Sequence, residues 1–373
     1  MKKFCNCLGG MLIFLCLFGS CSMEGAGFTE NTLQEEEGKK EEKAKDANKN
    51  DNEDEKKEDD TGDIENPAEE IPPIPEFLSC KAVSETEIVF KFSQPVKITA
   101  LKFDPELVIN EETAEGNDVR IKLAENPKPG MQVKAEFQAE DGHDNIVSGH
   151  VTFRTRNDSV PLLQINELRT ENENDKLRAE FIELKMISSG NLGALRVYVA
   201  GNKDPLLYEF SPVEVKEKDY VVLHLRTYND SSKDEYGGNL NESVGSDSCS
   251  TAFDFWIPGS NKLLHKTDVV YVMDQDDRVL DAVILSDNSS SVWSTGIATA
   301  VEFLFSKGIW KSSSGAVCSP ADAVSSFGTT ATRTICRDEA AGNTHTAANW
   351  YVTVTSGATP GQKNNINRYI QGS

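Results

Sequence analysis

Short runs in which apolar and polar residues alternate constrain the fold of this chain more than any other feature of its sequence. A period of two places successive side chains on opposite faces of an extended strand, so each run predicts a β-strand with one buried face. Turn-forming residues separate the runs, which favours antiparallel sheets packed face to face. Between residues 76 and 157 the runs are Glu87–Phe92, Val96–Ile98, Val119–Leu123, Val133–Phe137 and Val151–Arg154.

The spacing of these runs predicts an immunoglobulin-like β-sandwich for residues 76–157. Two turns agree with it: Phe92–Val96 and Asp141–Asn145 resemble turns of bacterial Ig-like domains from surface proteins. The resemblance implies an architecture and no particular ligand. Asp141, His143 and Asp144 could suggest a catalytic group, but a solvated turn between two strands explains these residue types better.

A second set of β-rich runs lies within residues 158–373, so the predicted fold class is all-β, with two immunoglobulin-like β-sandwich domains in tandem. Two insertions interrupt this second domain: a long loop over Asn229–Thr251, and residues 296–348, which contain an apparent helix over Ile297–Ile309 and a Ser/Thr-rich stretch. The predicted strands are Leu163–Leu168, Ala179–Leu184, Leu195–Val199, Asp219–Leu225, Asp268–Asp274 and Arg278–Val283.

The order of several motifs in this second half resembles a bacterial lamin-tail domain. The motifs are Ile165-Asn166-Glu167, Ile182-Glu183-Leu184, the paired runs around Asp268 and Asp281, Trp350, and Thr359-Pro360-Gly361 followed by Asn364. The resemblance implies an Ig-fold β-sandwich in which the glutamates at 167 and 183 recur. Without a companion histidine or metal pattern, they suggest strand-end hydrogen bonding more than acid–base chemistry. The two insertions depart from the family's minimal core, and loops are where a sandwich usually makes its specific contacts.

The N-terminus predicts export and lipid anchoring. Lys2 and Lys3 precede an apolar run, Leu8–Phe18, that stops at Gly19-Ser20-Cys21, as in a secretory signal peptide over residues 1–20. The segment resembles the lipobox of bacterial lipoproteins, including relaxed forms in spirochaetes and Bacteroidetes, which implies acylation of Cys21, for example with palmitate. The run is shorter than the roughly 20 apolar residues that cross a bilayer. Ser22, in place of Asp, favours the outer membrane.

Residues 21–75 predict a disordered acidic tether. Residues 30–70 hold 18 acidic and 7 basic side chains and no aromatic residue, so −11 of the chain's net charge of −23 lies there. Such a stretch cannot bury enough apolar surface to offset the entropy of ordering. We interpret it as a solvated spacer that holds the folded domains off the membrane.

Four cysteines remain beyond the signal peptide and Cys21, namely Cys80, Cys249, Cys318 and Cys336. Export to an oxidising compartment favours pairing, and a bridge from Cys318 to Cys336 or Cys249 is expected because all three belong to one domain. The sequence does not choose the pairing. Free buried thiols are the alternative.

The sequence contains no pattern typical of a catalytic, metal or cofactor site. Its five histidines form no H-E-x-x-H or H-x-H arrangement, and no G-x-S-x-G elbow occurs. The acidic balance argues against nucleic acid, which needs clustered lysine and arginine. An Asp-x-Asp turn at 274–277 fits a hairpin better than calcium, because the glycine bend and distant glutamate of a calcium loop are missing. Core packing explains the large aromatic residues better than a glycan-binding surface does; they are Phe253, Phe255, Trp256, Trp293, Trp310 and Trp350.

The sequence therefore predicts a non-enzymatic, lipid-anchored envelope lipoprotein that serves in binding, adhesion or envelope structure. Its expected partners are the membrane, through the acyl chains, and a protein or glycan ligand of unknown identity. An accessory that recruits an exported nuclease or phosphoesterase is one alternative, and a divergent hydrolase with its site in the insertions is another. The residues chosen as possible binding-loop positions are Asn229, Asp230, Asp247, Asp274, Asp276 and Asp277.

Overall fold

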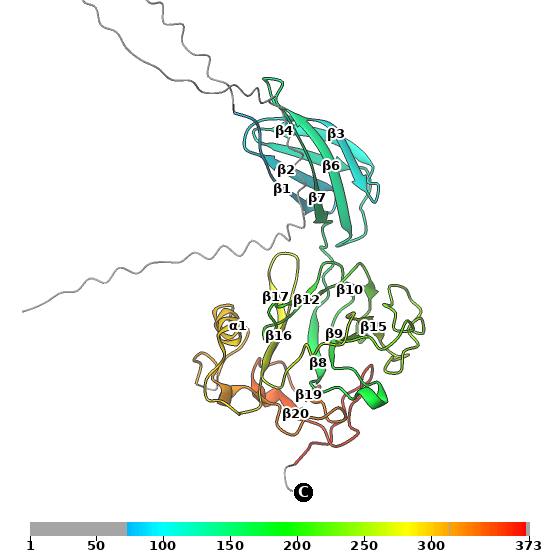
Figure 1. Ribbon diagram of the computed structural model, residues 1–373, viewed down its shortest axis with the longest axis vertical. Coiled ribbons are helices and arrows are strands. Elements are labelled where there is room, and N and C mark those ends of the chain that lie inside the picture. Colours follow the sequence, from blue (N-terminus) through cyan, green and yellow to red (C-terminus); the bar gives the residue numbers. More distant parts are fainter. Residues whose placement is uncertain (1–72, 313, 371–373) are drawn as a thin grey trace, which may run out of the picture.

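A computed structural model describes residues 73–312 and 314–370 of the 373-residue chain. The predicted signal peptide, Cys21 and nearly all of the predicted tether lie outside the described residues. Within them the regular elements are almost all strands, with one α-helix, and the chain forms two β-sandwiches placed end to end (Figure 1). No helix among the described residues is long and apolar enough to cross a membrane.

The first sandwich packs a four-stranded sheet of order β1-β2-β5-β4 against a three-stranded sheet of order β3-β6-β7. Inward-facing phenylalanines fill the space between them, with Phe90 and Phe92 both meeting Phe137 edge to face. The strands are β1 (Phe77–Ser84), β2 (Glu87–Phe92), β3 (Lys97–Asp104), β4 (Ile109–Glu115), β5 (Asp118–Leu123), β6 (Gln132–Glu140) and β7 (Ile146–Arg154).

Two strands of this sandwich, β1 and β4, were not predicted, because neither alternates clearly. Every residue of β4 is exposed, since it is an edge strand that pairs only with β5. β1 buries Ala82 alone and pairs with β2 across two register shifts. A strand that buries no apolar face shows no alternation of apolar and polar residues, so its sequence does not predict it.

The second sandwich packs a five-stranded sheet, β12-β11-β16-β17-β18, against a six-stranded sheet, β15-β14-β9-β8-β19-β20. Together with the first sandwich this confirms the predicted fold class, two immunoglobulin-like β-sandwiches with a helical and loop insertion in the second. A short pair, β10 (Gly190–Asn191) with β13 (Glu214–Val215), lies beside them. The five-stranded sheet comprises β12 (Leu206–Glu209), β11 (Arg196–Val199), β16 (Asp268–Met273), β17 (Val279–Ser286) and β18 (Val324–Ser325). The six-stranded sheet comprises β15 (Phe253–Trp256), β14 (Tyr220–His224), β9 (Phe181–Met186), β8 (Leu163–Arg169), β19 (Ile335–Arg337) and β20 (Trp350–Val352).

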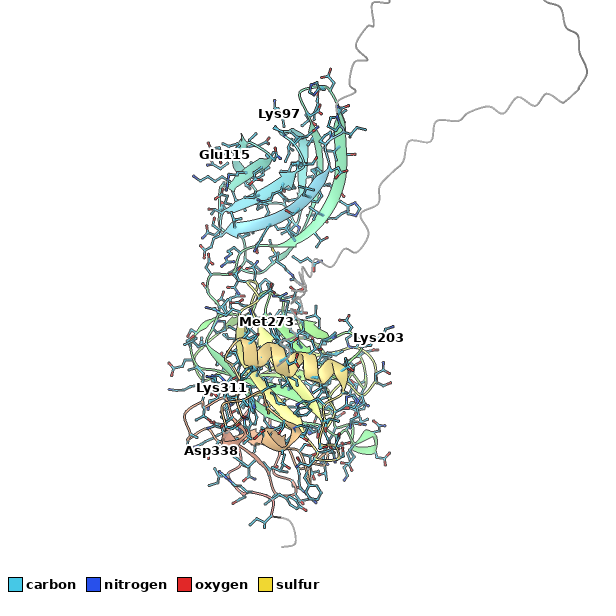
Figure 2. The ribbon with its side chains drawn as sticks, turned by 90° about the vertical axis from the view of Figure 1, so that its left-hand side faces the viewer. Lys97, Glu115, Lys203, Met273, Lys311 and Asp338 are labelled. Atoms are coloured by element: carbon cyan, nitrogen blue, oxygen red, sulfur yellow. The ribbon has the colours of Figure 1, made fainter. Side chains whose placement is uncertain are left out.

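The helix α1 (Thr295–Ser306) lies across the five-stranded sheet (Figure 2), where Phe303 meets Tyr271. Its buried residues recur with helical spacing, as expected for one apolar face against a sheet; they are Ile297, Ala300, Val301 and Leu304. It ends three residues earlier than predicted, because Gly308 takes the left-handed conformation with φ +71°. Single-turn 3₁₀ helices occur at Asn174–Lys176, Pro320–Asp322 and Ala347–Asn349.

The six-stranded sheet is buried on both faces, which strict alternation does not predict. Lys185 is the only residue of β9 that is not buried, and all of β15 is buried. Residues 226–252 and 357–364 form loops over its outer face, where Gly361 donates to Glu183 and Asp247 pairs with Arg169. Large aromatic residues are buried within this domain, which confirms core packing for Phe253, Phe255, Trp310 and Trp350. Trp256 is buried against His224 outside this core cluster, and Trp293 is half-buried.

The two sandwiches dock through a small polar junction. Asn157 is buried there, and its Nδ2 donates to the carbonyls of Asn191 at 2.9 Å and Gly193 at 2.8 Å. The backbones of Gly130 and Gly193 touch, since a Cβ added to Gly193 would lie 2.1 Å from the carbonyl oxygen of Pro129. Only glycine permits so close an approach.

The turn between β16 and β17, residues 274–277, completes the junction and reaches toward the first sandwich in Figure 1. Gln275 donates to the carbonyl of Thr155 and accepts from the backbone N–H of Asn157, both at 3.0 Å. Arg156 binds both carboxylate oxygens of Asp276, at 2.7 and 2.6 Å. The hairpin turn is therefore an interdomain contact.

Candidate functional site

Polar side chains gather on the outer face of the six-stranded sheet, under the two covering loops. Strand alternation points these side chains away from the inter-sheet core, and register places Glu183 opposite both Glu167 on β8 and Val222 on β14. Two clusters result. One surrounds Glu167 and Glu183, and the other surrounds His224.

The first cluster joins two cross-strand glutamates to the loop that follows β20. Glu167 accepts from the N–H and the hydroxyl of Thr359, at 3.1 Å each, and from the Thr334 hydroxyl. Glu183 accepts from the N–H of Gly361 at 2.6 Å and from Asn166 at 2.8 Å. Burial raises the pKa of both carboxyls, and the charge of Glu167 raises the pKa of Glu183 further.

Gly361 is fixed in this contact for steric reasons. It adopts φ +72°, and an added Cβ would lie 2.2 Å from Sγ of Cys249. The loop therefore approaches the sheet closely enough for its N–H to reach a buried carboxylate. This geometry matches the predicted hydrogen-bonding role of Glu167 and Glu183, but both residues lie inside their strands and not at the strand ends.

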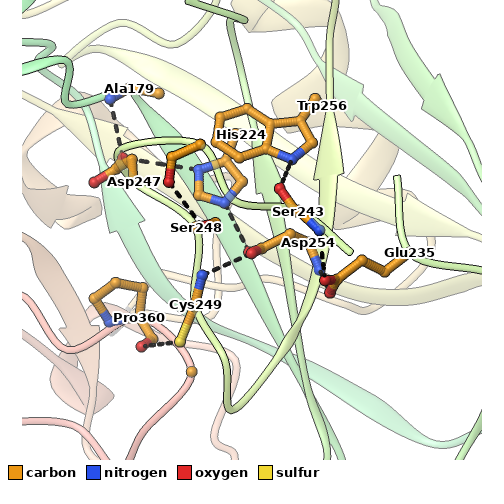
Figure 3. Close-up of polar contacts among 12 residues, drawn as sticks. Ala179, His224, Glu235, Ser243, Asp247, Ser248, Cys249, Asp254, Trp256 and Pro360 are labelled. Carbon is orange, nitrogen blue, oxygen red and sulfur yellow. Dashed lines mark hydrogen bonds and ion pairs between the residues drawn. The ribbon is translucent and has the colours of Figure 1, made fainter. Parts of the chain in front are cut away.

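The second cluster centres on His224, which is fully buried at the end of β14 (Figure 3). Its Nε2 lies 2.9 Å from Oδ1 of Asp254, and its Nδ1 lies 3.8 Å from Oδ2 of Asp247. The imidazole stacks on the indole of Trp256, with centroids 3.8 Å apart and planes 11° apart. Burial opposes the charged imidazole, but the contacts with Asp247 and Asp254 outweigh it, so the pKa of His224 is raised.

The carboxylates around His224 are held by the insertion loop itself. Asp254 accepts from the N–H of Cys249 at 2.6 Å, and its own N–H donates to Glu235 at 2.9 Å. Asp247 accepts from Arg169 at 2.7 Å and from the N–H of Ala179 at 3.0 Å. Burial works against ionised Asp247, yet His224 and Arg169 lower its pKa overall. These contacts pin the 226–252 loop onto the sheet.

The geometry around His224 does not form a nucleophile–base pair. Both ring nitrogens face carboxylates, and the nearest thiol, Cys249, directs its Sγ to the carbonyl of Pro360 at 3.1 Å (Figure 3). A nucleophile needs a base within hydrogen-bond reach and an open position for the substrate. We infer that the cluster fastens the loop.

Raising the pH from 6 to 9 is expected to weaken the second sandwich through His224. A histidine with a raised folded-state pKa contributes its full stabilisation below the unfolded value of roughly 6.5, and loses it as the pH rises through the folded pKa. Urea unfolding at both pH values should show a stability gap between the natural chain and His224→Gln that narrows at pH 9. His143→Gln, in an exposed turn, is the control and should show no gap. A gap that is constant with pH would contradict the charged state of His224.

A third buried ion pair lies where β17, β8 and β19 meet. Asp281 is fully buried and accepts from Arg337 at 2.5 Å and from the N–H of Ile165 at 2.7 Å. Arg337 also donates to the carbonyl of Ile165 at 2.7 Å and lies 4.5 Å over the ring of Trp350. Burial raises the pKa of Asp281 although Arg337 opposes the shift.

Most of the predicted binding-loop residues are engaged internally. Asp247 pairs with Arg169, Asp276 with Arg156, and Asp277 with Arg196 at 2.7 Å. Asp274 is buried and accepts from the N–H groups of Asp276 and Arg278, which closes the hairpin turn. Asn229 and Asp230 are exposed at the start of the insertion loop, and the structure brings neither into a cluster.

The bridge expected among Cys249, Cys318 and Cys336 is not formed, and these three cysteines are thiols. Their positions give the reason. Cys318 is buried in the main core, Cys336 lies opposite Glu167 on the outer face of the six-stranded sheet, and Cys249 contacts Pro360. Burial raises the pKa of the Cys318 thiol to about 12, so it is protonated and unreactive at neutral pH.

Alkylation under denaturing, non-reducing conditions is expected to modify Cys249, Cys318 and Cys336 in every molecule. Peptide mass analysis measures the modified fraction at each cysteine. Prior reduction is the control and should add no further label. Label that appears only after reduction would show a bridge and contradict the free thiols.

The sequence contained a signal for the His224 cluster that the predictions did not use. His224 and Asp254 each stand within an otherwise apolar strand, Tyr220–His224 and Phe253–Trp256. A charged residue inside a buried run needs a buried partner, because an unpaired charge costs several kcal/mol. On that ground, a buried contact between His224 and Asp254 could have been predicted from the sequence.

An open groove of about 470 Å³ lies next to the glutamate cluster. Lys185, Lys218 and Lys363 line it with the ring of Tyr220 and the carboxylate of Glu339. Lys185 forms an ion pair with Glu339, and Glu339 accepts from the N–H of Asn364 at 2.9 Å. The groove is therefore fixed to the same network that holds the loop after β20.

Comparisons with known proteins place the second sandwich in a family. The model described as TP_1001_2nd, protein second domain, matches residues 161–352, slightly more than half of the chain. An uncharacterized protein of Treponema pallidum (strain Nichols) is 33% identical over 151 residues, which are 38% of this chain and 37% of that protein. The chain thus spans little more than a third of the length of this relative.

Two solved structures are similar at 13% sequence identity. One is the N-terminal part of the bacterial S-layer protein SbsC, with a TM-score of 0.22, covering 57% of this chain and 44% of that one. The other is a DUF4876 family protein from Bacteroides thetaiotaomicron VPI-5482, with a TM-score of 0.25, covering 71% and 87%. TM-scores this low bear on neither fold nor function.

Proposed function

The chain belongs to the family described as TP_1001_2nd, protein second domain, and we propose that it is a non-catalytic, lipid-anchored protein of the bacterial cell envelope. Its role is binding, adhesion or envelope structure. Its partners are the membrane, through acyl chains on Cys21, and a protein or glycan ligand. Nucleic acid does not fit a chain of net charge −23.

The N-terminal sequence supports the anchor. The lipobox-like segment ends at Cys21, and Ser22 favours retention at the outer membrane. Two or more acyl chains hold a protein stably at a bilayer, where one chain does not. The acidic stretch that follows would keep the two docked sandwiches away from the lipid surface.

One observation carries the non-catalytic part of the proposal: the buried acids of the second sandwich are engaged by internal donors. Glu167 and Glu183 hold the 359–361 loop, Asp254 holds His224 and Cys249, and Asp281 holds Arg337. A general acid or base must instead face an open site where a substrate can be placed.

The same contacts support a lamin-tail type for the second sandwich. The motifs Ile165-Asn166-Glu167 and Ile182-Glu183-Leu184 lie far from Thr359-Pro360-Gly361 in sequence, and their glutamates hold that loop. A set of motifs that contact one another acts as one structural unit. The insertion loop and α1 are additions to that unit.

Proteolysis of intact cells, followed by mass analysis of the N-terminal peptide, tests the anchor. We expect an acylated Cys21 in the natural chain and release of the Cys21→Ala variant from the membrane fraction. Digestion from outside would support a ligand on host or neighbouring cells, and protection would support a partner within the envelope. An unmodified Cys21 in a membrane-bound chain would overturn lipid anchoring.

Activity measurements test the non-catalytic assignment. Nucleic acid, phosphoester and glycan substrates should show no turnover, with or without a chelator. Turnover that is lost in a Glu183→Gln variant that remains folded would overturn the assignment and favour the divergent hydrolase.

A further inference from the structure

The groove beside Glu339 concentrates positive charge on a chain that is otherwise acidic. Three lysines line it against two glutamates, and Nζ of Lys218 lies 3.5 Å from the carboxylate of Glu217, in an ion pair whose side chains are both exposed. Glu339 is occupied by Lys185, whose pKa it raises against the effect of burial. Lys363 is exposed and makes no ion pair or hydrogen bond within residues 73–312 and 314–370. The charge of Lys363 is therefore left for a ligand, and an exposed ion pair such as that of Lys218 with Glu217 is weak enough to give way to one.

The fold holds the side chain of Lys185 and the backbone of Lys218 in position. Lys218 adopts φ +76°, its N–H donates to the carbonyl of Met186 at 2.9 Å, and Met186 in turn donates to the carbonyl of Asp219 at 2.9 Å. Lys185 is fixed by Glu339 and lies 5.4 Å from the ring centre of Tyr220. A non-glycine residue with positive φ is strained, and such strain is found at binding sites more than elsewhere.

The groove suits a saccharide better than an extended peptide. Only two strands, β9 and β14, contribute to its lining, and the other lining residues lie in loops. Both are interior strands, since β9 pairs with β8 and β14, and β14 pairs with β9 and β15. Their backbone groups are used, so no strand edge is free to pair with a peptide. The half-buried ring of Tyr220 and the exposed side chain of Ile187 supply apolar surface beside the cations. Aromatic and aliphatic surface next to charged donors fits a sugar ring that carries an anionic group.

We propose that this groove binds an acidic saccharide, with Lys218 and Lys363 pairing with its carboxylate groups and Tyr220 packing against a sugar ring. The inference rests on the proposed binding function and names its ligand class. A volume of about 470 Å³ is enough for one or two sugar units. A lysine ammonium is a compact point charge and lacks the planar, bidentate guanidinium of arginine. The site should therefore recognise the position of negative charge on the saccharide, and it should not require one particular planar acid group.

Calorimetric titration of the full chain with a mannuronate tetrasaccharide tests the proposal, with neutral mannotetraose as the comparison probe. The natural chain should bind the uronate and not the neutral sugar, and binding should weaken as salt rises. Lys218→Glu with Lys363→Glu should reduce the affinity at least tenfold. The matched control is Lys203→Glu, an exposed lysine after β11, which should leave the affinity unchanged (Figure 2).

A second variant separates binding from folding. Lys218→Gly removes the charge and places glycine at φ +76°, so the melting temperature should not fall while the affinity does. Equal affinity for both sugars, loss of binding in Lys203→Glu, or tighter binding of a tetraglutamate peptide would overturn the saccharide assignment. The anchored, non-catalytic role is tested separately on cells through Cys21, so either proposal can fail without the other.

Discussion

Replacing Arg337 by methionine is expected to destabilise the second sandwich by about 3–5 kcal/mol, because the change leaves the carboxylate of Asp281 buried without its cation. Arg337 and Asp281 are almost inaccessible to solvent, and Arg337 also satisfies the carbonyl of Ile165. Urea unfolding followed by tryptophan fluorescence measures the loss, since Trp350 packs against Arg337. A cost below about 1 kcal/mol would show that water reaches Asp281.

The charge rather than the volume should account for most of this loss, and a second variant tests that. Arg337→Met combined with Asp281→Asn buries no charge and is expected to recover part of the stability. The pH dependence gives an independent check. Without Arg337 the pKa of Asp281 rises further, so the destabilisation should be smaller at pH 5 than at pH 8. A loss that is the same at both pH values, with no recovery in the double variant, would point to packing instead.

Replacing Gly193 by alanine is expected to separate the two sandwiches. The new Cβ would lie 2.1 Å from the carbonyl oxygen of Pro129 and 3.0 Å from Oδ1 of Asn191, so the backbone must shift. The contacts of Asn157 with residues 191 and 193 depend on that backbone position. Forced overpacking of this kind costs about 1–3 kcal/mol or more. Calorimetry should show one unfolding transition in the natural chain and two in Gly193→Ala.

Limited trypsin digestion gives a second readout of the same change. Arg156 is bound by Asp276 at the junction, so cleavage after it should be slow in the natural chain and faster in Gly193→Ala. Gly142→Ala is the matched control, because an added Cβ there meets nothing within 4 Å. Coincident transitions and unchanged cleavage in Gly193→Ala would show that the junction tolerates the shift.

The strands of the first sandwich could be predicted because their signal is local. In β2, β5 and β6 apolar side chains alternate with polar ones, and the structure buries the apolar set. The edge strand β4 could not be predicted, since all its residues face solvent. The helix α1 followed from apolar residues at helical spacing, but it begins at Thr295, before the predicted Ile297, and ends at Ser306, before the left-handed Gly308.

The roles of the acidic residues were predicted less well. The glutamates at 167 and 183 were assigned to hydrogen bonding, but their partners in the 359–361 loop are 192 and 178 residues away. The aspartates at 247 and 276 were expected to face a ligand, because loop composition is polar in exposed and in docked loops alike. Exposed and docked loops differ in how deeply their side chains are buried, and that burial depends on which segments pack over the loop.

The class of the fold, the turns, the helix and the expectation of export follow from local patterns, because periodicity, turn chemistry and an apolar leader are properties of neighbouring residues. Three features appear only in the folded chain: the six-stranded sheet is covered on both faces, His224 and Arg337 are buried beside carboxylates, and the hairpin at 274–277 joins the two sandwiches. Desolvation and close approach depend on distant segments, and no local pattern records which segments meet.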